Sequence, residues 1–275
     1  RSSSQGRQPP RKSDDQGPSN GSAKHVNGLL KACDKVGTDK AIVFNTNRSM
    51  EKPDEKLLKA ANAHADRLIP FARLLPDTHT PSDIERFKDM GFVGFKVIIT
   101  RKNYDDHSYW PLYETAAELK MPILFHLGIV GRSDAGFDVN SNRMRPIYLD
   151  AICRAFPKLH VHGAHLGNPW YEEASMSARW NANLWFDLSG STLKKKTPEF
   201  IDRLFWWHRG DHPYKGHKKK HPYRKILYGT DVANEWMEDV YNDYVHLCDA
   251  LKTPKRWRQA IFGDNALRML YEKRN

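Results

Sequence analysis

Three side chains that can bind a metal ion stand at the ends of short apolar segments. His126 ends the run Ile-Leu-Phe-His, His165 ends Val-His-Gly-Ala-His, and Asp231 ends Ile-Leu-Tyr-Gly-Thr-Asp. Imidazole nitrogens and carboxylate oxygens bind Zn2+ and similar ions, at bond lengths of about 2.0–2.2 Å. A lone histidine in such a place is more often a hydrogen-bonded structural residue. Three residues in comparable places favour a shared metal site.

These segments belong to a regular alternation of strand-like and helix-like stretches. The strand-like runs are 41–45, 68–74, 93–99, 122–126, 159–165, 184–188 and 226–230. The helix-like stretches are 25–36, 53–65, 81–90, 110–119, 146–156, 170–181 and 198–207, followed by 235–250, 254–261 and 264–273. Apolar strands separated by amphipathic helices indicate parallel βαβ units.

A doubly wound sheet and a TIM (β/α)8-type barrel both satisfy this alternation. The regular spacing and the polar residues at strand ends favour the barrel, because barrel enzymes place their chemistry at the C-terminal ends of the strands. His126 and His165, on consecutive strands, can then converge on one pocket with Asp231. The count of seven strands, with a helix before the first, predicts that strand 1 is absent from this chain.

Composition sets the domain organisation and the expected compartment. Residues 1–22 contain almost no apolar side chains and are expected to form a loop or a disordered segment, so that 23–275 form the barrel domain. No apolar run approaches the roughly 20 residues of a membrane span, which predicts a soluble protein. Cys33, Cys153 and Cys248 are scattered, without a C-x-x-C pair. Free thiols in a reducing, cytoplasmic compartment are therefore expected.

The formal net charge of +11 raises the question of nucleic acid as a partner. Much of the excess is local, in the run 194–196 and in the stretch 209–225, which also carries histidines. No recognisable nucleic-acid motif accompanies these charges, and a basic surface can instead steer anionic substrates. A small anionic substrate is the expected partner, with no nucleic acid and no membrane, and a homo-oligomer is left open. A second metal site among His208, His212, His217 and His221 is less favoured than a solvated loop.

The order of the motifs resembles the amidohydrolase-related family of the amidohydrolase superfamily. Pro122-Ile-Leu-Phe-His-Leu-Gly, Gly163-Ala-His-Leu-Gly and Ile226-Leu-Tyr-Gly-Thr-Asp are similar to its strands 5, 6 and 8. Gly91-Phe-Val-Gly-Phe-Lys, Phe186-Asp-Leu-Ser-Gly and the closing Phe262-Gly-Asp-Asn-Ala-Leu-Arg-Met-Leu are similar to further segments. The resemblance covers about residues 25 to 273.

The resemblance implies a divalent metal, with zinc the expected ion, that activates a water molecule. By position, His126 is a ligand, His165 is a ligand or holds the water, and Asp231 is a ligand and proton shuttle. The implied reaction is hydrolysis of a small organic acid derivative (an amide, ester or lactone). Non-oxidative decarboxylation is the alternative within the family. The non-enzymatic alternative is a catalytically inactive barrel that serves as a binding or scaffold protein.

The chain departs from the family at its N-terminal end. The family has a His-x-His pair at the end of strand 1, whereas here the first histidine is His25, on a predicted helix. The only such pair, His160 and His162, lies inside a later strand. Loss of strand 1 ahead of Arg1 would explain both departures, the missing strand and the missing pair. A catalytically inactive protein would explain them as well. A chain without this strand is expected to be unstable and to bind metal weakly.

Weaker candidates for substrate contacts lie near the same strand ends. Arg132 and Arg145 are expected to bind the substrate, because guanidinium groups pair with carboxylates. Trp170 is expected to form a wall of the pocket, although helix packing would explain it equally well. Lys96 lies in a strand where some members of the superfamily carry a metal-bridging modified lysine; here a plain lysine that faces the pocket mouth is favoured.

Overall fold

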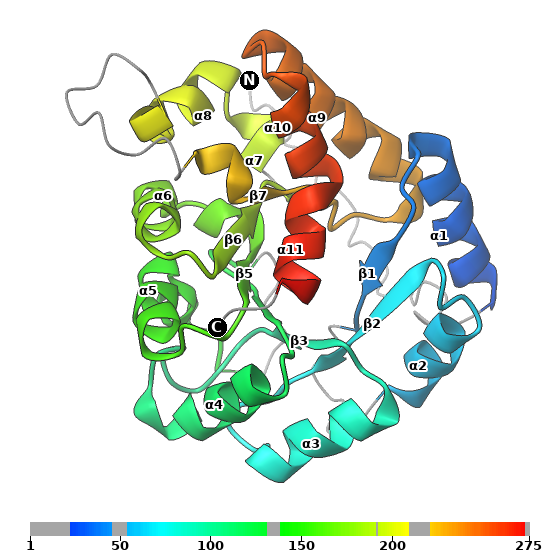
Figure 1. Ribbon diagram of the computed structural model, residues 1–275, viewed down its shortest axis with the longest axis vertical. Coiled ribbons are helices and arrows are strands. Elements are labelled where there is room, and N and C mark those ends of the chain that lie inside the picture. Colours follow the sequence, from blue (N-terminus) through cyan, green and yellow to red (C-terminus); the bar gives the residue numbers. More distant parts are fainter. Residues whose placement is uncertain (1–22, 46–53, 131–137, 191, 209–220, 273–275) are drawn as a thin grey trace, which may run out of the picture.

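The computed structural model describes residues 23–45, 54–130, 138–190, 192–208 and 221–272. Within these ranges the chain forms one seven-stranded parallel sheet whose strands follow the order of the sequence. The strands are β1 (Ala41–Val43), β2 (Leu68–Arg73), β3 (Gly94–Val97), β4 (Ile123–Phe125), β5 (Val161–Gly163), β6 (Leu184–Asp187) and β7 (Ile226–Leu227). The sheet curls into a ring with helices around its outside (Figure 1). The predicted barrel class is thereby confirmed.

The helices surround the sheet, and α2 to α8 lie in the connections between its parallel strands. They are α1 (Ala23–Val36), α2 (Glu55–Asn62), α3 (Pro81–Met90), α4 (Trp110–Glu118), α5 (Pro146–Ala155), α6 (Tyr171–Trp180), α7 (Thr192–Lys195), α8 (Pro198–Leu204), α9 (Met237–Ala250), α10 (Lys255–Gln259) and α11 (Asn265–Tyr271). Local signals fix their ends: Asp54 caps α2, Thr80 and Asp83 form a capping box on α3, and Gly91 ends α3 at φ 101°. None of the helices that the structure describes is long and apolar enough to span a membrane.

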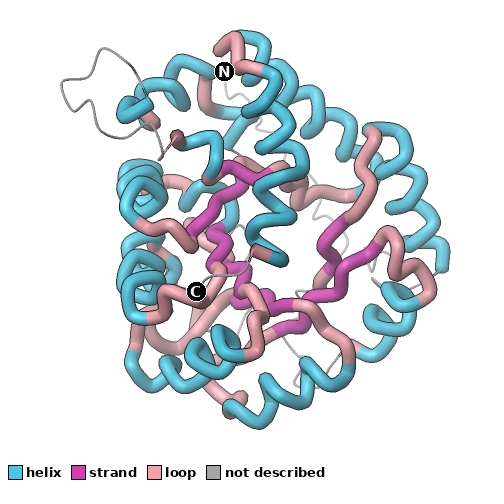
Figure 2. Tube along the Cα trace, in the orientation of Figure 1, coloured by secondary structure: helices cyan, strands magenta, loops and turns pink. Residues whose placement is uncertain are grey.

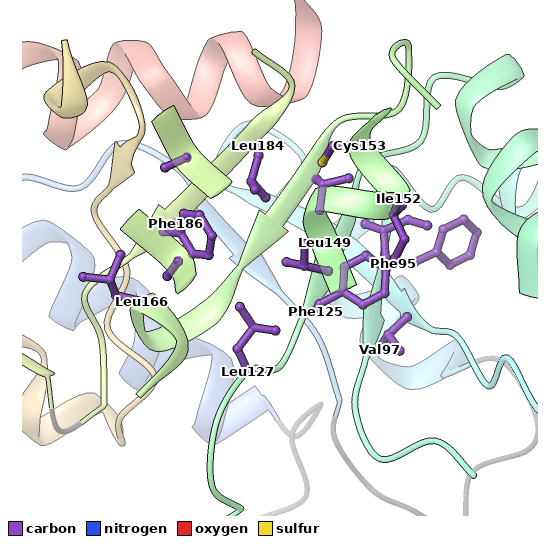
Figure 3. Packing of buried hydrophobic residues seen from close by; sticks show 14 of the residues in the cluster. Phe95, Val97, Phe125, Leu127, Leu149, Ile152, Cys153, Leu166, Leu184 and Phe186 are labelled. Atoms are coloured by element: carbon purple, nitrogen blue, oxygen red, sulfur yellow. The ribbon is translucent and has the colours of Figure 1, made fainter. Parts of the chain in front are cut away.

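The main hydrophobic core lies between the outer face of the sheet and the helices. Phe95, Phe125 and Phe186 project outward from three strands and are fully buried. They belong to one cluster with side chains such as Leu149 and Ile152 of α5 (Figure 3). Close-packed aromatic and branched side chains of this kind hold the strands at fixed positions. The residues that follow the strands are therefore presented on a rigid frame.

A second, smaller cluster fills the interior of the ring. It joins side chains of several strands and of the turn after β5 with two residues of the last helix: Ile69, Phe71, Leu124, Ala164, Trp185, Leu227, Met269 and Leu270. Asn265, at the start of α11, donates hydrogen bonds to the carbonyl oxygens of Tyr223, in the turn before β7, and of Ile226, the first residue of β7. Helix α11 therefore covers the N-terminal end of the barrel, opposite the end where the metal-binding residues are expected.

The strand register places Lys96 and His162 inside the ring. Lys96 pairs with Leu124, Leu124 pairs with His162, and His162 pairs with Trp185. Leu124 and Trp185 belong to the interior cluster, so Lys96 and His162 lie on the same inner face. Both are buried. The inner face of the barrel thus carries buried polar side chains beside the apolar cluster.

The ring of strands is open between β1 and β7 (Figure 2). In the part of the chain covered by the structure, the sheet ends at these two strands. Each residue of β1 is only partly buried, whereas five of the six residues of β2 are buried. The segment 1–22, expected not to supply a strand, lies outside the described residues. The weak stability expected of the chain stays a prediction.

Candidate active site

The structure brings His126, His165 and Asp231 together at the C-terminal ends of β4, β5 and β7. The rings of His126 and His165 meet edge to face, with centroids 5.0 Å apart. Nε2 of His165 lies 3.5 Å from Oδ2 of Asp231. His165 is largely buried, whereas the side chain of Asp231 is 55% exposed. The three residues therefore form a continuous row that reaches solvent at Asp231.

The backbone around His165 differs from the sequence-based prediction. The strand predicted for 159–165 ends at Gly163, and a 3-10 turn (η3, Ala164–Gly167) follows. His165 and Leu166 have φ values of 60° and 47°. The backbone N–H of His165 donates to Oδ1 of Asp187 at 3.0 Å, which is why the chain leaves the strand path there. The left-handed turn costs energy and orients the ring toward Asp231.

Asp187, at the end of β6, is the most heavily hydrogen-bonded carboxylate of the site. Its Oδ1 accepts from the backbone N–H of His165, from that of Ser189 at 2.9 Å and from the Ser189 hydroxyl. Its Oδ2 lies 2.7 Å from Nε2 of His162. Burial by itself raises the pKa of Asp187, but the hydrogen bond and charge of His162, with further help from His165 and Ser189, hold that pKa well below its usual range. Asp187 is therefore ionised.

Ser189 connects Asp187 to the ring of His165. Its Oγ lies 2.8 Å from Nδ1 of His165. Gly190 follows at φ 68°, and a Cβ there would come within 3.0 Å of Nδ1 of His165. Both observations require glycine at this position. The segment Asp187–Gly190 thus forms a close-fitting support for one side of the His165 ring.

Lys96 supplies a buried positive charge on the inner face of the barrel. The residue is 4% exposed, and its Nζ lies 5.2 Å from the centroid of the Phe44 ring. Burial lowers the pKa of Lys96 to about 8, against the opposing influence of the Asp231 and Asp187 charges; Arg73 lowers it further. The group is therefore a cation at neutral pH that neighbouring negative charge only partly offsets.

Of the residues expected to bind the substrate, the structure describes Arg145 and Trp170 but not Arg132. Arg145 forms an ion pair with Glu173, and its guanidinium carbon lies 5.3 Å from the centroid of a Trp170 ring. Arg145 therefore contacts both Trp170 and Glu173, a residue of α6. Arg143 pairs with Asp138 at 2.7 Å. Arg132 lies outside the described residues, so the substrate-binding role of these loops stays a prediction.

The Lys-rich segment falls mostly outside the part that the structure describes. His212 and His217 lie outside the described residues, so the solvated loop expected there stays a prediction. His221 does lie in the structure, where its ring stacks on Trp257 with centroids 4.1 Å apart. This histidine takes part in packing.

The donor set can be tested for its fit to a divalent metal. Over residues 23–45, 54–130, 138–190, 192–208 and 221–272, no three His, Cys, Asp or Glu side chains gather around one point as a complete metal site. The donor types nevertheless suit such an ion: two imidazoles beside a carboxylate, with Nε2 of His165 facing Oδ2 of Asp231. Two electron-pair donors that face each other at 3.5 Å are stabilised by a proton or a cation between them. The described residues therefore fit part of a metal-binding site.

Three residues of this site were not predicted from the sequence: His162, Asp187 and Ser189. Asp187 ends an apolar strand, as His126 does, and the same criterion would have selected it. Its segment Phe186-Asp-Leu-Ser-Gly resembles the family but does not by itself mark a site. His162 stands within a strand, where the sequence alone does not reveal which face a side chain occupies.

Fold and site together define a TIM-barrel protein with histidine and carboxylate groups at the C-terminal mouth of the barrel. The family model described as amidohydrolase matches residues 34–271. The chain belongs to this family. A search of curated proteins finds no match.

Solved structures share the fold at low sequence identity. An uncharacterized TIM-barrel protein from Bordetella bronchiseptica is 17% identical with a TM-score of 0.68, over 88% of this chain and 81% of that one. A probable 2-pyrone-4,6-dicarboxylic acid hydrolase from Acinetobacter baumannii, with citric acid bound, is 16% identical with a TM-score of 0.60, over 89% and 88%. A 5-carboxyvanillate decarboxylase from Novosphingobium aromaticivorans, with bound manganese and a nitrobenzoic acid, is 16% identical with a TM-score of 0.62, over 93% and 85%.

Proposed function

We propose that this protein is a divalent-metal-dependent hydrolase that acts on a small substrate carrying a carboxylate. The observation that carries the proposal is the row formed by His126, His165 and Asp231 at the mouth of an amidohydrolase-family barrel. His126, His165 and Asp231 would hold the metal. When bound, a divalent metal supplies Lewis acidity and makes water a nucleophile at neutral pH.

The protein's own residues have separable tasks in this proposal. The side chain of Asp231 is half exposed and lies beside His165. Its Oδ2 accepts the proton of the attacking water and then delivers that proton to the leaving group. His165, fixed by the support from Asp187 and Ser189, holds Nε2 toward that carboxylate. The buried cation Lys96 attracts the carboxylate of the substrate into the barrel mouth.

The class of substrate is supported by the ligands of the structural neighbours. The probable hydrolase carries citric acid and the decarboxylase carries a nitrobenzoic acid, both of which are small carboxylates. The neighbour with manganese makes Mn2+ a candidate ion beside Zn2+. Trp170 and Arg145 remain candidates for the wall of the substrate pocket.

Non-oxidative decarboxylation is the second candidate function. A specific observation favours it: several structural neighbours are decarboxylases of aromatic acids. In that reaction, a proton must be delivered to the carbon that loses CO2, and Asp231 would deliver it. The same residues therefore serve either reaction, and the substrate decides between them.

The test is a substrate panel with the chain loaded with Zn2+ or Mn2+. The panel contains lactones and esters of dicarboxylic acids on one side and hydroxybenzoic acids on the other. Hydrolysis is expected, and Asp231→Asn should lower kcat by at least about 100-fold, the usual contribution of a general acid–base. Asp239→Asn changes an exposed carboxylate on α9 and should have no effect. CO2 release without hydrolysis would support the second candidate. No turnover of any substrate in the panel would contradict both candidate functions.

A further inference from the structure

We propose that Asp187 and Ser189 are positioning residues that fix the tautomer of His165, with the proton on Nδ1 and the lone pair on Nε2. The hydrogen bonds from Asp187 through Ser189 to His165 carry this inference. The tautomer follows from the geometry alone. Only its consequence for metal affinity rests on the proposed function.

The assignment follows from counting donors along the chain of hydrogen bonds. Oδ1 of Asp187 accepts two backbone N–H groups, from His165 and Ser189, so this oxygen carries no proton itself. The hydrogen between Asp187 and Ser189 therefore belongs to the Ser189 hydroxyl. A hydroxyl has one hydrogen, so Oγ of Ser189 can only accept from Nδ1 of His165. A neutral His165 then keeps Nε2 unprotonated.

The same carboxylate also orients the ring. Oδ1 of Asp187 binds the backbone of His165 directly and its side chain through Ser189. His162 holds the other oxygen, Oδ2, at 2.7 Å from within the barrel. Asp187 is thereby fixed at both oxygens, and both ends of His165 depend on it. Partners of this kind set the tautomer and the basicity of metal-binding histidines.

The consequence lies at Nε2, which faces Asp231 at 3.5 Å. With the Nδ1–H tautomer, this nitrogen offers a lone pair to a metal ion at the mouth. With the other tautomer, Nε2–H would donate to the Asp231 carboxylate and occupy the position of the metal. Loss of the Ser189 hydroxyl should therefore favour the Nε2–H tautomer, because Asp231 then offers the better acceptor.

The experiment measures the tautomer directly, by 15N NMR of the imidazole nitrogens in the metal-free chain, and metal affinity separately, by titration with Zn2+. The variants are Ser189→Ala and, as a matched control, Ser177→Ala. Ser177 is also buried, and its hydroxyl has no hydrogen-bond partner among the residues of the structure. The wild type should show a protonated Nδ1 on His165, and Ser189→Ala should shift the proton toward Nε2 and weaken Zn2+ binding by about 10- to 100-fold. Ser177→Ala should change neither.

Two results would overturn the inference: a wild-type His165 protonated on Nε2, or a tautomer that Ser189→Ala leaves unchanged. The wild-type spectrum decides the first point even if the variant does not fold. Absence of Zn2+ binding in every variant would refute the proposed function instead. In that case the tautomer shift alone still decides whether Asp187 and Ser189 act as argued.

Discussion

Replacement of Lys96 by methionine should make the protein more stable while it weakens substrate binding. Lys96 is 4% exposed, and burial lowers its pKa from 10.5 to about 8. Each unit of such a shift corresponds to about 1.4 kcal/mol of preference for the neutral form. At pH 7 the buried charge thus costs about 3 kcal/mol relative to the unfolded chain. Methionine has a similar shape and removes the charge.

The sign of the pH dependence follows from the same shift. The pKa of Lys96 in the folded state lies below its value in the unfolded chain, so the unfolded state binds the proton more tightly. The cost is fully present below about pH 8 and is relieved as the pH rises toward 10.5. The Lys96→Met variant should therefore exceed the wild type by about 3 kcal/mol at pH 7 and by less than about 1 kcal/mol at pH 10. The charged groups around Lys96 are Asp231, Asp187 and Arg73.

The assay is urea unfolding of the wild type and the Lys96→Met variant at pH 7 and pH 10. Lys88→Met, on the exposed side of α3, is the matched control and should leave stability nearly unchanged. With an active preparation, Lys96→Met should raise KM for a carboxylate substrate more than it lowers kcat. A destabilised Lys96→Met variant, or a stability difference independent of pH, would refute the account of Lys96 as a strained buried cation.

Two further predictions concern the supports of the site and of the barrel. The pKa of Asp187 is depressed in the folded state, so the stabilising effect of its charge is present above about pH 3.9 and is lost as the pH falls below that value. The Asp187→Asn variant should therefore show a flatter decline of Tm between pH 5 and pH 2. An unchanged decline would contradict this account of Asp187. Asn265 is fully buried and donates to two carbonyl oxygens, one in the turn before β7 and one at the start of β7. Asn265→Ala should lower the free energy of unfolding by about 2–4 kcal/mol, since two acceptors lose their donor; a loss below 1 kcal/mol by chemical unfolding would show that α11 is not held there.

The sequence allowed the fold to be predicted because buried parallel strands leave a strong pattern. Apolar runs such as Ile123–Phe125 sit between helices with apolar faces, and each run became a strand within a few residues. Strand ends were placed less well. The strand predicted through His165 ends at Gly163, because Asp187, 22 residues further along the chain, binds the His165 backbone. Such a long-range hydrogen bond has no local signal.

The proximity of the three candidate site residues could be predicted for the same reason, while their role stays a prediction. His126, His165 and Asp231 follow apolar runs, so a simple rule finds them. The residues that support them act through tertiary contacts: Ser189 through the ring of His165, and His162 through Asp187. Lys96 was noted, but its burial in the barrel interior depends on register and on which face of β3 turns inward. Only the folded structure provides these facts.

The central claim is that His126, His165 and Asp231 bind one divalent metal ion. A calorimetric titration of the metal-free chain with Zn2+ and with Mn2+ tests this claim most directly. The chain should bind one ion saturably, even if weakly, and His126→Ala, His165→Ala and Asp231→Asn should each weaken binding by at least about tenfold, while Asp239→Asn should not. Binding that is unaffected by all three substitutions, or no saturable binding by the unaltered chain, would contradict the claim.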